Sequence, residues 1–218
     1  MVKCERPFPP PPSLEKRKSY NEPDTVQQLK SIFHNKCYIC EMQDLQDGII
    51  EHLIPHGGNS DLKFDWENLF WACNRCNSIK NRQEYEGKII DCCKVDPEKH
   101  LRCIYDPYTK QITVIPKDRQ ETSKMTAQLI TETYNLADTG IREHSLSQRL
   151  RAFQEEWDTF FKLLNQYRKD KSRYTARKIK SKLSVKTAFA AIKRDYIRQH
   201  PNEYKDFQEL VAVSKESD

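Results

Sequence analysis

Two cysteine pairs with the same internal spacing are the residues whose types and positions most clearly allow chemistry. Cys37 and Cys40 form the first pair, Cys73 and Cys76 form the second, and 32 residues separate the pairs. A gap of two residues lets both thiolates of a pair reach one tetrahedral zinc ion. Four sulfurs close the coordination sphere, so this zinc would be structural and leave no position for a substrate. Any reaction must therefore use side chains that the zinc holds in place.

A redox or disulfide role is the alternative for a Cys-x-x-Cys pair. Two pairs around a histidine-containing insert, with no alternation of strands and helices beside them, favour zinc. The sequence also shows no secretory leader and no run of about 18 apolar residues, which predicts a cytoplasmic protein without a membrane partner. We expect the remaining cysteines to stay thiols there; they are Cys4, Cys92, Cys93 and Cys103.

The insert between the pairs, and the residue behind it, carry the groups of one reaction class. Glu51 and His52 are adjacent, Asn68 precedes an apolar stretch, and Asn77 follows the last cysteine. A neutral imidazole can take a proton from water at physiological pH. Carboxylate and amide oxygens suit Mg²⁺ or Mn²⁺, which stabilises charge on a phosphate and its leaving oxygen. We expect a phosphodiesterase in which His52 activates water while Glu51 and Asn77 hold one metal ion.

This series of residues resembles the HNH, or ββα-metal, nuclease family over about 50 of the 218 residues. The resemblance implies that His52 is the general base and that Asn68 braces the loop and the base. Asn77 stands where many members have a third histidine, and there it implies a Mg²⁺ ligand. Glu51 stands where Asp is commoner, and Lys80 is the helix cation for which we expect a contact with nucleic acid.

A second resemblance extends along more of the chain, to the PtuB-type HNH subunit of Septu and retron-associated antiphage systems. It is carried by the proline-containing start, by Asp96-Pro97 with the segment that follows, and by the helical tail. The resemblance implies an antiviral defence effector, a metal-dependent endonuclease that favours DNA and has an ATPase partner of the ABC/SMC type. The alternatives are a nuclease acting on RNA such as tRNA, or a non-catalytic zinc module that binds nucleic acid or a protein.

Local patterns predict the elements that position these groups. A strand over Gly48–Ile54 should end at Pro55, a second strand should cover Leu69–Ala72, and Asn74 should cap a helix that carries Asn77. A short helix is predicted over 24–33. The predicted fold class is α+β, with a small zinc-stapled ββα-metal core followed by a hairpin and a mainly helical C-terminal region.

The chain divides by composition into three parts. Residues 1–22 form a proline-rich arm, which we expect to dock on the protein's own surface or a partner or to act as a linker. Residues 23–100 are the nuclease core. Residues 101–218 hold a predicted hairpin, Leu101–Asp106 with Gln111–Pro116, and then helices with an apolar stripe between 146 and 167.

Charge is unevenly placed along a chain whose total formal charge is only +5. Residues 34–86 carry five Lys/Arg against nine Asp/Glu, a net of −4, whereas residues 171–199 carry ten Lys/Arg against one Asp, a net of +9. The cysteine-bounded region therefore cannot attract a polyanion by bulk charge, and the basic segment can. Binding of nucleic acid and docking of a protein partner both remain open as uses of that segment.

Overall fold

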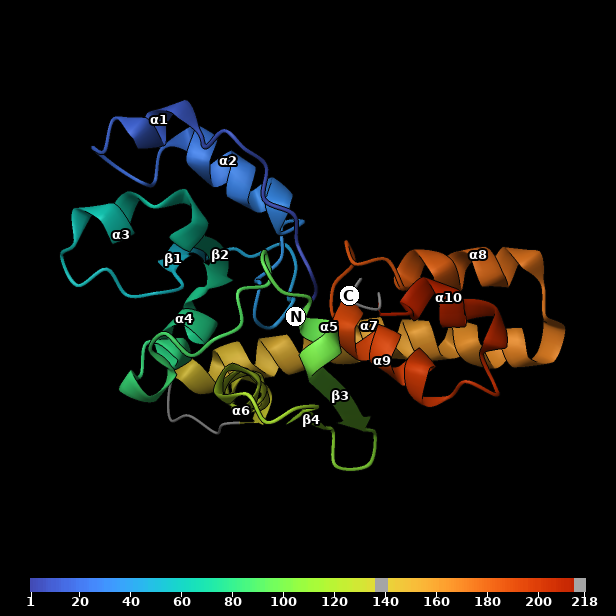
Figure 1. The fold of residues 1–218 in the computed structure, drawn as a ribbon. Helices are drawn as coiled ribbons and strands as arrows, with labels where there is room; N and C mark the ends of the chain where they lie inside the picture. The colour runs from blue at the N-terminus through green and yellow to red at the C-terminus, as the bar shows by residue number, and fades with distance from the viewer. Residues whose placement is uncertain (136–140, 214–218) are drawn as a thin grey trace.

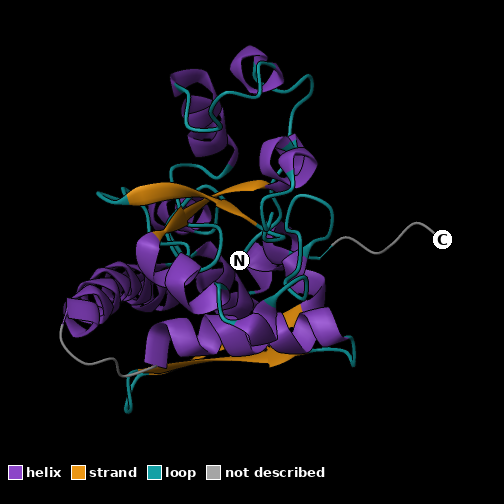
Figure 2. Cartoon of the chain, turned by 90° about the vertical axis from the view of Figure 1, so that its left-hand side faces the viewer, coloured by secondary structure: helices purple, strands orange, loops and turns teal. Residues whose placement is uncertain are grey.

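The computed structural model describes residues 1–135 and 141–213, without the side chains of 141–145. Its described part contains two separate two-stranded antiparallel sheets surrounded by helices (Figure 1). Seen from the side, the two hairpins lie on different levels of the molecule (Figure 2). The predicted α+β class, with small sheets and a helical C-terminal region, is confirmed.

The N-terminal residues lie against the protein's own surface. Two helices, α1 (Pro12–Glu15) and α2 (Pro23–Ile32), both begin with a proline, whose fixed φ suits the first helical position. Before them, the Arg6 guanidinium donates to the backbone oxygens of Trp66 and Leu69 at 2.7 and 2.9 Å. Of the uses left open for the proline-rich arm, docking on the protein itself is the one observed.

The first sheet and the helix behind it follow the predicted order. Strand β1 (Gly48–His52) pairs with β2 (Leu69–Cys73), so that Gly48 lies opposite Cys73 and His52 opposite Leu69. Helix α3 (Ser60–Phe64) lies in the connection, and α4 (Asn74–Lys80) follows β2 directly. A side chain at Gly48 would be impossible without movement, because a Cβ there would lie 2.1 Å from the Trp71 ring. Strand β1 ends at His52, two residues before the predicted end.

The second sheet matches its prediction at both ends. Strand β3 (Leu101–Asp106) pairs with β4 (Gln111–Pro116), and α5 (Pro97–His100) leads into it. Helix α6 (Glu121–Asn135) packs on β4, and α9 (Ala190–Gln199) packs on β3. The β3–β4 hairpin is therefore packed against one helix from the middle of the chain, α6, and one helix from near its end, α9.

Helix α7 (Ile141–Asp170) runs from the cysteine region to the C-terminal helices (Figure 1). Helix α8 (Arg173–Lys182) packs along it, and α10 (Gln208–Val211) packs on α9. Most of the predicted apolar stripe of α7 is buried, as expected for a core-facing helix. The buried residues of this stripe are Phe153, Trp157, Phe160, Leu164 and Tyr167. Short 3-10 turns cover Trp66–Asn68, Gln83–Tyr85 and Lys205–Phe207.

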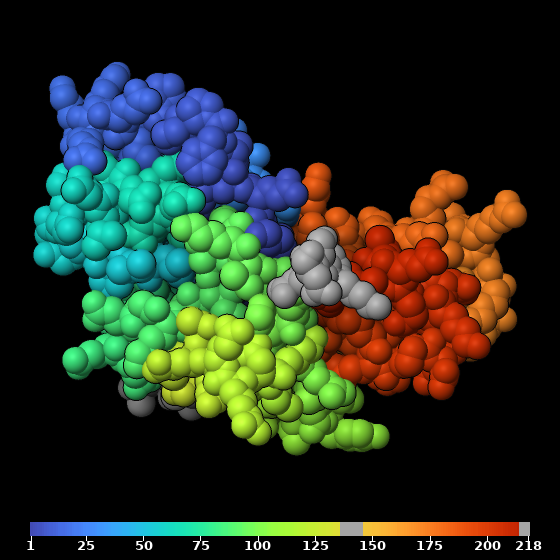
Figure 3. Space-filling view, viewed as in Figure 1, coloured from blue at the N-terminus to red at the C-terminus, as the bar shows by residue number. Residues whose placement is uncertain are grey.

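Buried charges join the end of the chain to its beginning. The Glu41 carboxylate binds the Lys36 ammonium at 3.1 Å and also accepts from the backbone N–H of Ala191 at 2.9 Å. Glu98 lies in α5 and is buried with two arginines of α9 as its partners. Without the C-terminal segment, Glu98 would lose the two arginines that pair with it, and Glu41 would lose a backbone hydrogen bond. In the space-filling view, the blue N-terminal part borders the orange part of the C-terminal region near the centre of the molecule (Figure 3).

Candidate zinc centre and candidate active site

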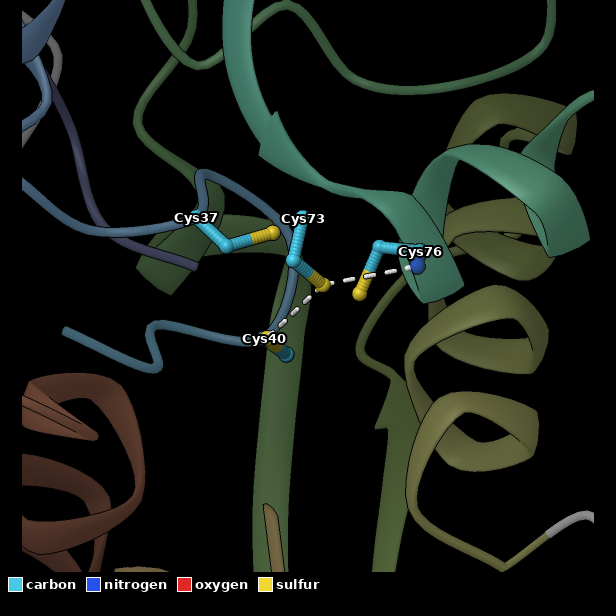
Figure 4. Close-up of side chains that lie close together, drawn as sticks. All are labelled: Cys37, Cys40, Cys73 and Cys76. Carbon is cyan, nitrogen blue, oxygen red and sulfur yellow. Dashed lines mark hydrogen bonds between the residues drawn. The ribbon is translucent and has the colours of Figure 1, made fainter. Parts of the chain in front are cut away.

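The four predicted zinc ligands lie together. The sulfur atoms of Cys37, Cys40, Cys73 and Cys76 all lie within 4.8 Å of one another, and all four residues are buried. They come from the turn before β1, from the end of β2 and from the first turn of α4, and their sulfurs point toward one centre (Figure 4). A tetrahedral Zn²⁺ with Zn–S bonds of about 2.3 Å needs sulfurs about 3.8 Å apart. The donor set fits a structural zinc after a slight contraction.

The local fold at Cys73 differs from the prediction in one respect. Cys73, and not Asn74, is the N-cap of α4, because its sulfur accepts from the backbone N–H of Cys76 at 3.5 Å. Asn74 is the first helical residue, and its amide donates to the Asp47 carboxylate at 3.1 Å. A cysteine sulfur that caps the helix holding the next ligand fixes both ligands in one geometry. The cysteine cluster and the start of α4 are therefore one structural unit.

Arg149 of α7 reaches into the cysteine cluster. Its Nη2 donates to Cys73 Sγ at 2.9 Å, and the residue is only 2% exposed. Its Nε and Nη1 have no hydrogen-bond partner among the described residues. A buried guanidinium needs a nearby negative charge, and four thiolates around Zn²⁺ supply a formal charge of −2. This arrangement suits a metal–thiolate centre and attaches α7 to it.

His52 lies at the end of β1 and is half-buried. Its Nε2 lies 3.0 Å from the Lys63 carbonyl, which can only accept, so a neutral ring carries its proton on Nε2. Its Nδ1 is left with the lone pair. Burial lowers the pKa of His52, the Lys63 carbonyl raises it and His56 lowers it, and the net direction is downward. The rings of Tyr20 and His56 lie against it at 4.9 and 4.8 Å. The imidazole is therefore oriented and neutral at pH 7.

Asn68 holds the loop that orients His52. Its Oδ1 accepts from the backbone N–H of Ile54 at 2.7 Å, and its Nδ2 donates to the carbonyls of Ile54 and Leu62 at 2.8 and 3.0 Å. Leu62 immediately precedes Lys63, whose carbonyl accepts from His52. The buried amide thus ties both ends of the loop together and fixes the group that sets the His52 tautomer.

Glu51 and Lys80 form a buried ion pair, which changes the expectation for both residues. Lys80 Nζ lies 2.9 Å from Glu51 Oε2, both side chains are at most 1% exposed, and Nζ also donates to the His52 carbonyl. The other carboxylate oxygen of Glu51 accepts from the Tyr38 hydroxyl. Lys80 is therefore a structural partner and does not present its charge to nucleic acid, which corrects that prediction. Glu51 and His52 contact different side chains, as neighbours on a strand do.

Asn77 is the predicted metal ligand that remains accessible. It is half-buried, and its side-chain amide has no hydrogen bond to the described residues. It lies one turn before Lys80, on the same face of α4, and Lys80 reaches the end of β1. Both oxygens of Glu51 have protein partners in this arrangement, the Tyr38 hydroxyl and the Lys80 ammonium, whereas the Asn77 amide oxygen has none among the described residues.

Sequence reasoning missed two residues of this region. Tyr38 lies between two zinc ligands and gave no signal of its contact with Glu51. Arg149 did leave one: it lies three residues after Leu146 and four before Phe153, on the predicted apolar face of α7. A charged residue on an apolar face needs a buried partner, which for Arg149 is the cysteine cluster.

No helix in the described ranges is both long and apolar enough to cross a bilayer. No protein-family profile matches the chain. A comparison with curated proteins finds the Septu protein PtuB of Bacillus thuringiensis, which is 30% identical over 78 residues. The alignment covers 34% of this chain and 30% of that protein, so the matched part is about a third of either length. Over that third, this chain is similar to a Septu-type protein.

Proposed function

We propose that this chain is an HNH-type endonuclease that hydrolyses phosphodiester bonds of nucleic acid, with DNA as the favoured substrate. The observation that carries the proposal is His52: its ring is oriented by the Lys63 carbonyl, its Nδ1 is unprotonated, and its pKa is lowered. A fixed neutral imidazole at a half-exposed strand end is suited to take a proton from an attacking water.

The neighbouring residues have separate roles in this proposal. Asn68 keeps the loop closed and thereby keeps His52 in its tautomer. Asn77 supplies an amide oxygen on the adjacent helix, which can orient a phosphate-bound cation. A divalent cation would stabilise the charge on the phosphate and on the leaving oxygen. Glu51 supports the site from behind, through Lys80 and the His52 backbone, and does not bind the cation directly.

The proposed biological role is the effector of an antiphage defence complex. The likeness to a Septu protein over a third of the chain supports a defence role. The resemblance of the motifs to PtuB-type subunits adds an ATPase of the ABC/SMC type as the proposed partner. Affinity purification from the native host should recover such an ATPase with the full chain, and its consistent absence would remove that part of the proposal.

Plasmid cleavage tests the catalytic assignment. The full chain with Mg²⁺ or Mn²⁺, alone and with its partner, is assayed on supercoiled DNA and on tRNA. His52→Ala should abolish cleavage while zinc content and melting temperature stay unchanged, and Asn77→Ala should also lower the rate. His56→Ala is the matched control, because this ring contacts His52 but accepts from the backbone of Gly58. Equal losses in both histidine variants would refute the assignment of the base.

One observation favours a second candidate, a zinc module that binds nucleic acid or protein without cutting. The Glu51–Lys80 pair occupies the carboxylate that a catalytic metal would be expected to use. Under this alternative, the wild-type chain and His52→Ala both bind nucleic acid equally and neither cuts it under any metal condition. Metal-dependent cleavage that needs His52 excludes the module.

A further inference from the structure

Nine of the ten cations in the basic segment over 171–199 form two groups with different environments, and the tenth, Lys186, lies beyond the end of α8. Four of the nine cations form ion pairs with two carboxylates. Glu156 pairs with two of them at 2.8 and 2.6 Å, and the buried Glu98 pairs with the other two at 2.9 and 2.7 Å. These cations stabilise the fold and are not available to a partner. They are Lys182, Lys193, Arg194 and Arg198.

The cations on and just before α8 are exposed instead. The opposite side of this helix is fixed to the protein, with Thr175 and Ile179 buried and Ser172 capping the first turn. None of the exposed cations forms an ion pair with any residue in the described ranges. Together with the absence of any acid between 171 and 194, this leaves five exposed cations without an acidic partner on and just before α8. They are Lys171, Arg173, Arg177, Lys178 and Lys180.

This placement opposes the stability of α8 itself. Arg173 lies in the first turn, where the helix dipole disfavours a positive charge. Arg177 follows it by four residues and Lys180 follows Arg177 by three, and like charges at these spacings repel each other. An anionic partner would offset both the unfavourable interaction of Arg173 with the helix dipole and the repulsion between the like charges. A helix face that serves only as a solvated surface is normally relieved by interspersed acids, and none is present here.

We infer that the exposed face of α8 binds the phosphate backbone of nucleic acid. Duplex DNA carries one negative charge per about 1.7 Å of its axis, and the ten residues of α8 span about 15 Å. The face lacks the apolar centre that a protein interface needs, since Tyr174 is its only exposed large hydrophobic residue among those described. A tyrosine hydroxyl can itself donate to phosphate. The inference deepens the proposed function by assigning the surface that holds the substrate.

The position of α8 separates this contact from the candidate active site. Arg149 touches Cys73, and Asp170 at the end of α7 lies 21 residues later, so the start of α8 lies about 30 Å from the zinc centre. Helix α8 then runs back along α7, as its pairing of Lys182 with Glu156 requires. One turn of B-DNA spans about 34 Å. Helix α8 therefore extends from about 30 Å to about 10 Å along α7 from Arg149, a stretch shorter than one turn of B-DNA.

Equilibrium binding in the absence of cleavage tests the inference. The full chain with His52→Ala is titrated with a labelled duplex of about 30 base pairs at several salt concentrations, by fluorescence anisotropy. The test variant adds Arg177→Gln, Lys178→Gln and Lys180→Gln. The matched control adds Lys110→Gln, Lys124→Gln and Lys205→Gln, which remove the same charge from exposed sites elsewhere. Three lost phosphate contacts should reduce the slope of log K against log salt by about 2.7, since each contributes about 0.9.

The outcomes separate this inference from the nuclease proposal. A reduced slope in the α8 variant with an unchanged control supports the surface, even if the wild-type chain never cuts. Equal slopes in both variants, or no binding of nucleic acid by the full chain, overturn it. Unchanged nucleic-acid binding combined with loss of a co-purifying protein also overturns it, because α8 would then be a docking site. Cleavage that needs His52 but not α8 would retain the nuclease and reject the surface.

Discussion

Replacing Arg149 by methionine should lower the free energy of unfolding of the zinc-bound protein but not that of the zinc-free protein. With zinc bound, the guanidinium is the buried cation beside a centre with a formal charge of −2, and it is only 2% exposed. Removing one partner of a buried charge pair costs about 3–5 kcal/mol. Groups that hydrogen-bond to metal ligands typically contribute roughly 10–100-fold to metal affinity. We therefore expect weaker zinc binding and a large loss of stability in the zinc-bound form.

Without zinc, protonated thiols no longer supply the negative charge. The guanidinium would then be buried beside neutral sulfurs, with Nε and Nη1 still without partners among the described residues. A side chain of similar length without a charge removes that cost, so the free energy of unfolding should stay the same or rise. The sign of the effect thus reports the charge of the cysteine centre.

The measurements are urea unfolding of both forms and zinc transfer to a chromogenic chelator. Arg151→Met is the control, because Arg151 lies two residues further along α7 and is exposed. The reasoning is refuted if Arg149→Met destabilises both forms equally, which would indicate a packing role. It is also refuted if zinc transfers from Arg149→Met as slowly as from the control.

Three further changes have defined outcomes. Cys76→Ser removes a buried ligand, so zinc content by mass spectrometry and the melting temperature should both fall. Lys80→Met should cost about 3–5 kcal/mol in urea unfolding by stranding Glu51, and adding Glu51→Leu should recover part of that loss. Burial lowers the pKa of His52, so the imidazole stays neutral to a lower pH than a free histidine. The rate of nucleic-acid cleavage should therefore be constant at neutral pH and fall only as the pH decreases through this lowered pKa. The measurement is the cleavage rate between about pH 5 and 8.

Each of these has a result that would contradict it. Full zinc occupancy in Cys76→Ser would show that three sulfurs suffice. A double variant no more stable than Lys80→Met would mean that the unpaired carboxylate is not the source of the loss. A cleavage rate that rises toward pH 5 would require a protonated group in place of a neutral base at His52.

The elements that were predicted best are those specified by neighbouring residues. The hairpin over Leu101–Asp106 and Gln111–Pro116 was predicted to the residue, because alternation and a turn are local patterns. The four cysteines were also brought together as their spacing predicted. The cap of α4 was assigned to Asn74, since capping propensities do not include a cysteine sulfur, which here accepts from the backbone N–H of Cys76.

The errors concern charges whose partners lie far away in the sequence. Lys80 was expected at the surface, but it is buried in an ion pair with Glu51, which lies 29 residues earlier in the sequence. The basic segment looked uniform by count, whereas Glu98 and Glu156 pair with four of its ten cations and leave the exposed cations of α8 without ion pairs among the described residues. A count of charges cannot anticipate which side of a helix a distant carboxylate will approach.

The long reach of the buried contacts around Glu41 bears on how the protein is made. Lys36 donates to the carbonyls of Val185 and Thr187, which lie about 150 residues later in the chain. Glu41 accepts from the backbone N–H of Ala191, which is equally far away in the sequence. A ribosome adding 5–20 residues per second needs about 8–30 s for that interval. A nascent chain therefore holds all four cysteines well before it can bury the charges beside them. A translation product interrupted before residue 185 would contain all four cysteines but lack the distant partners of Lys36 and Glu41.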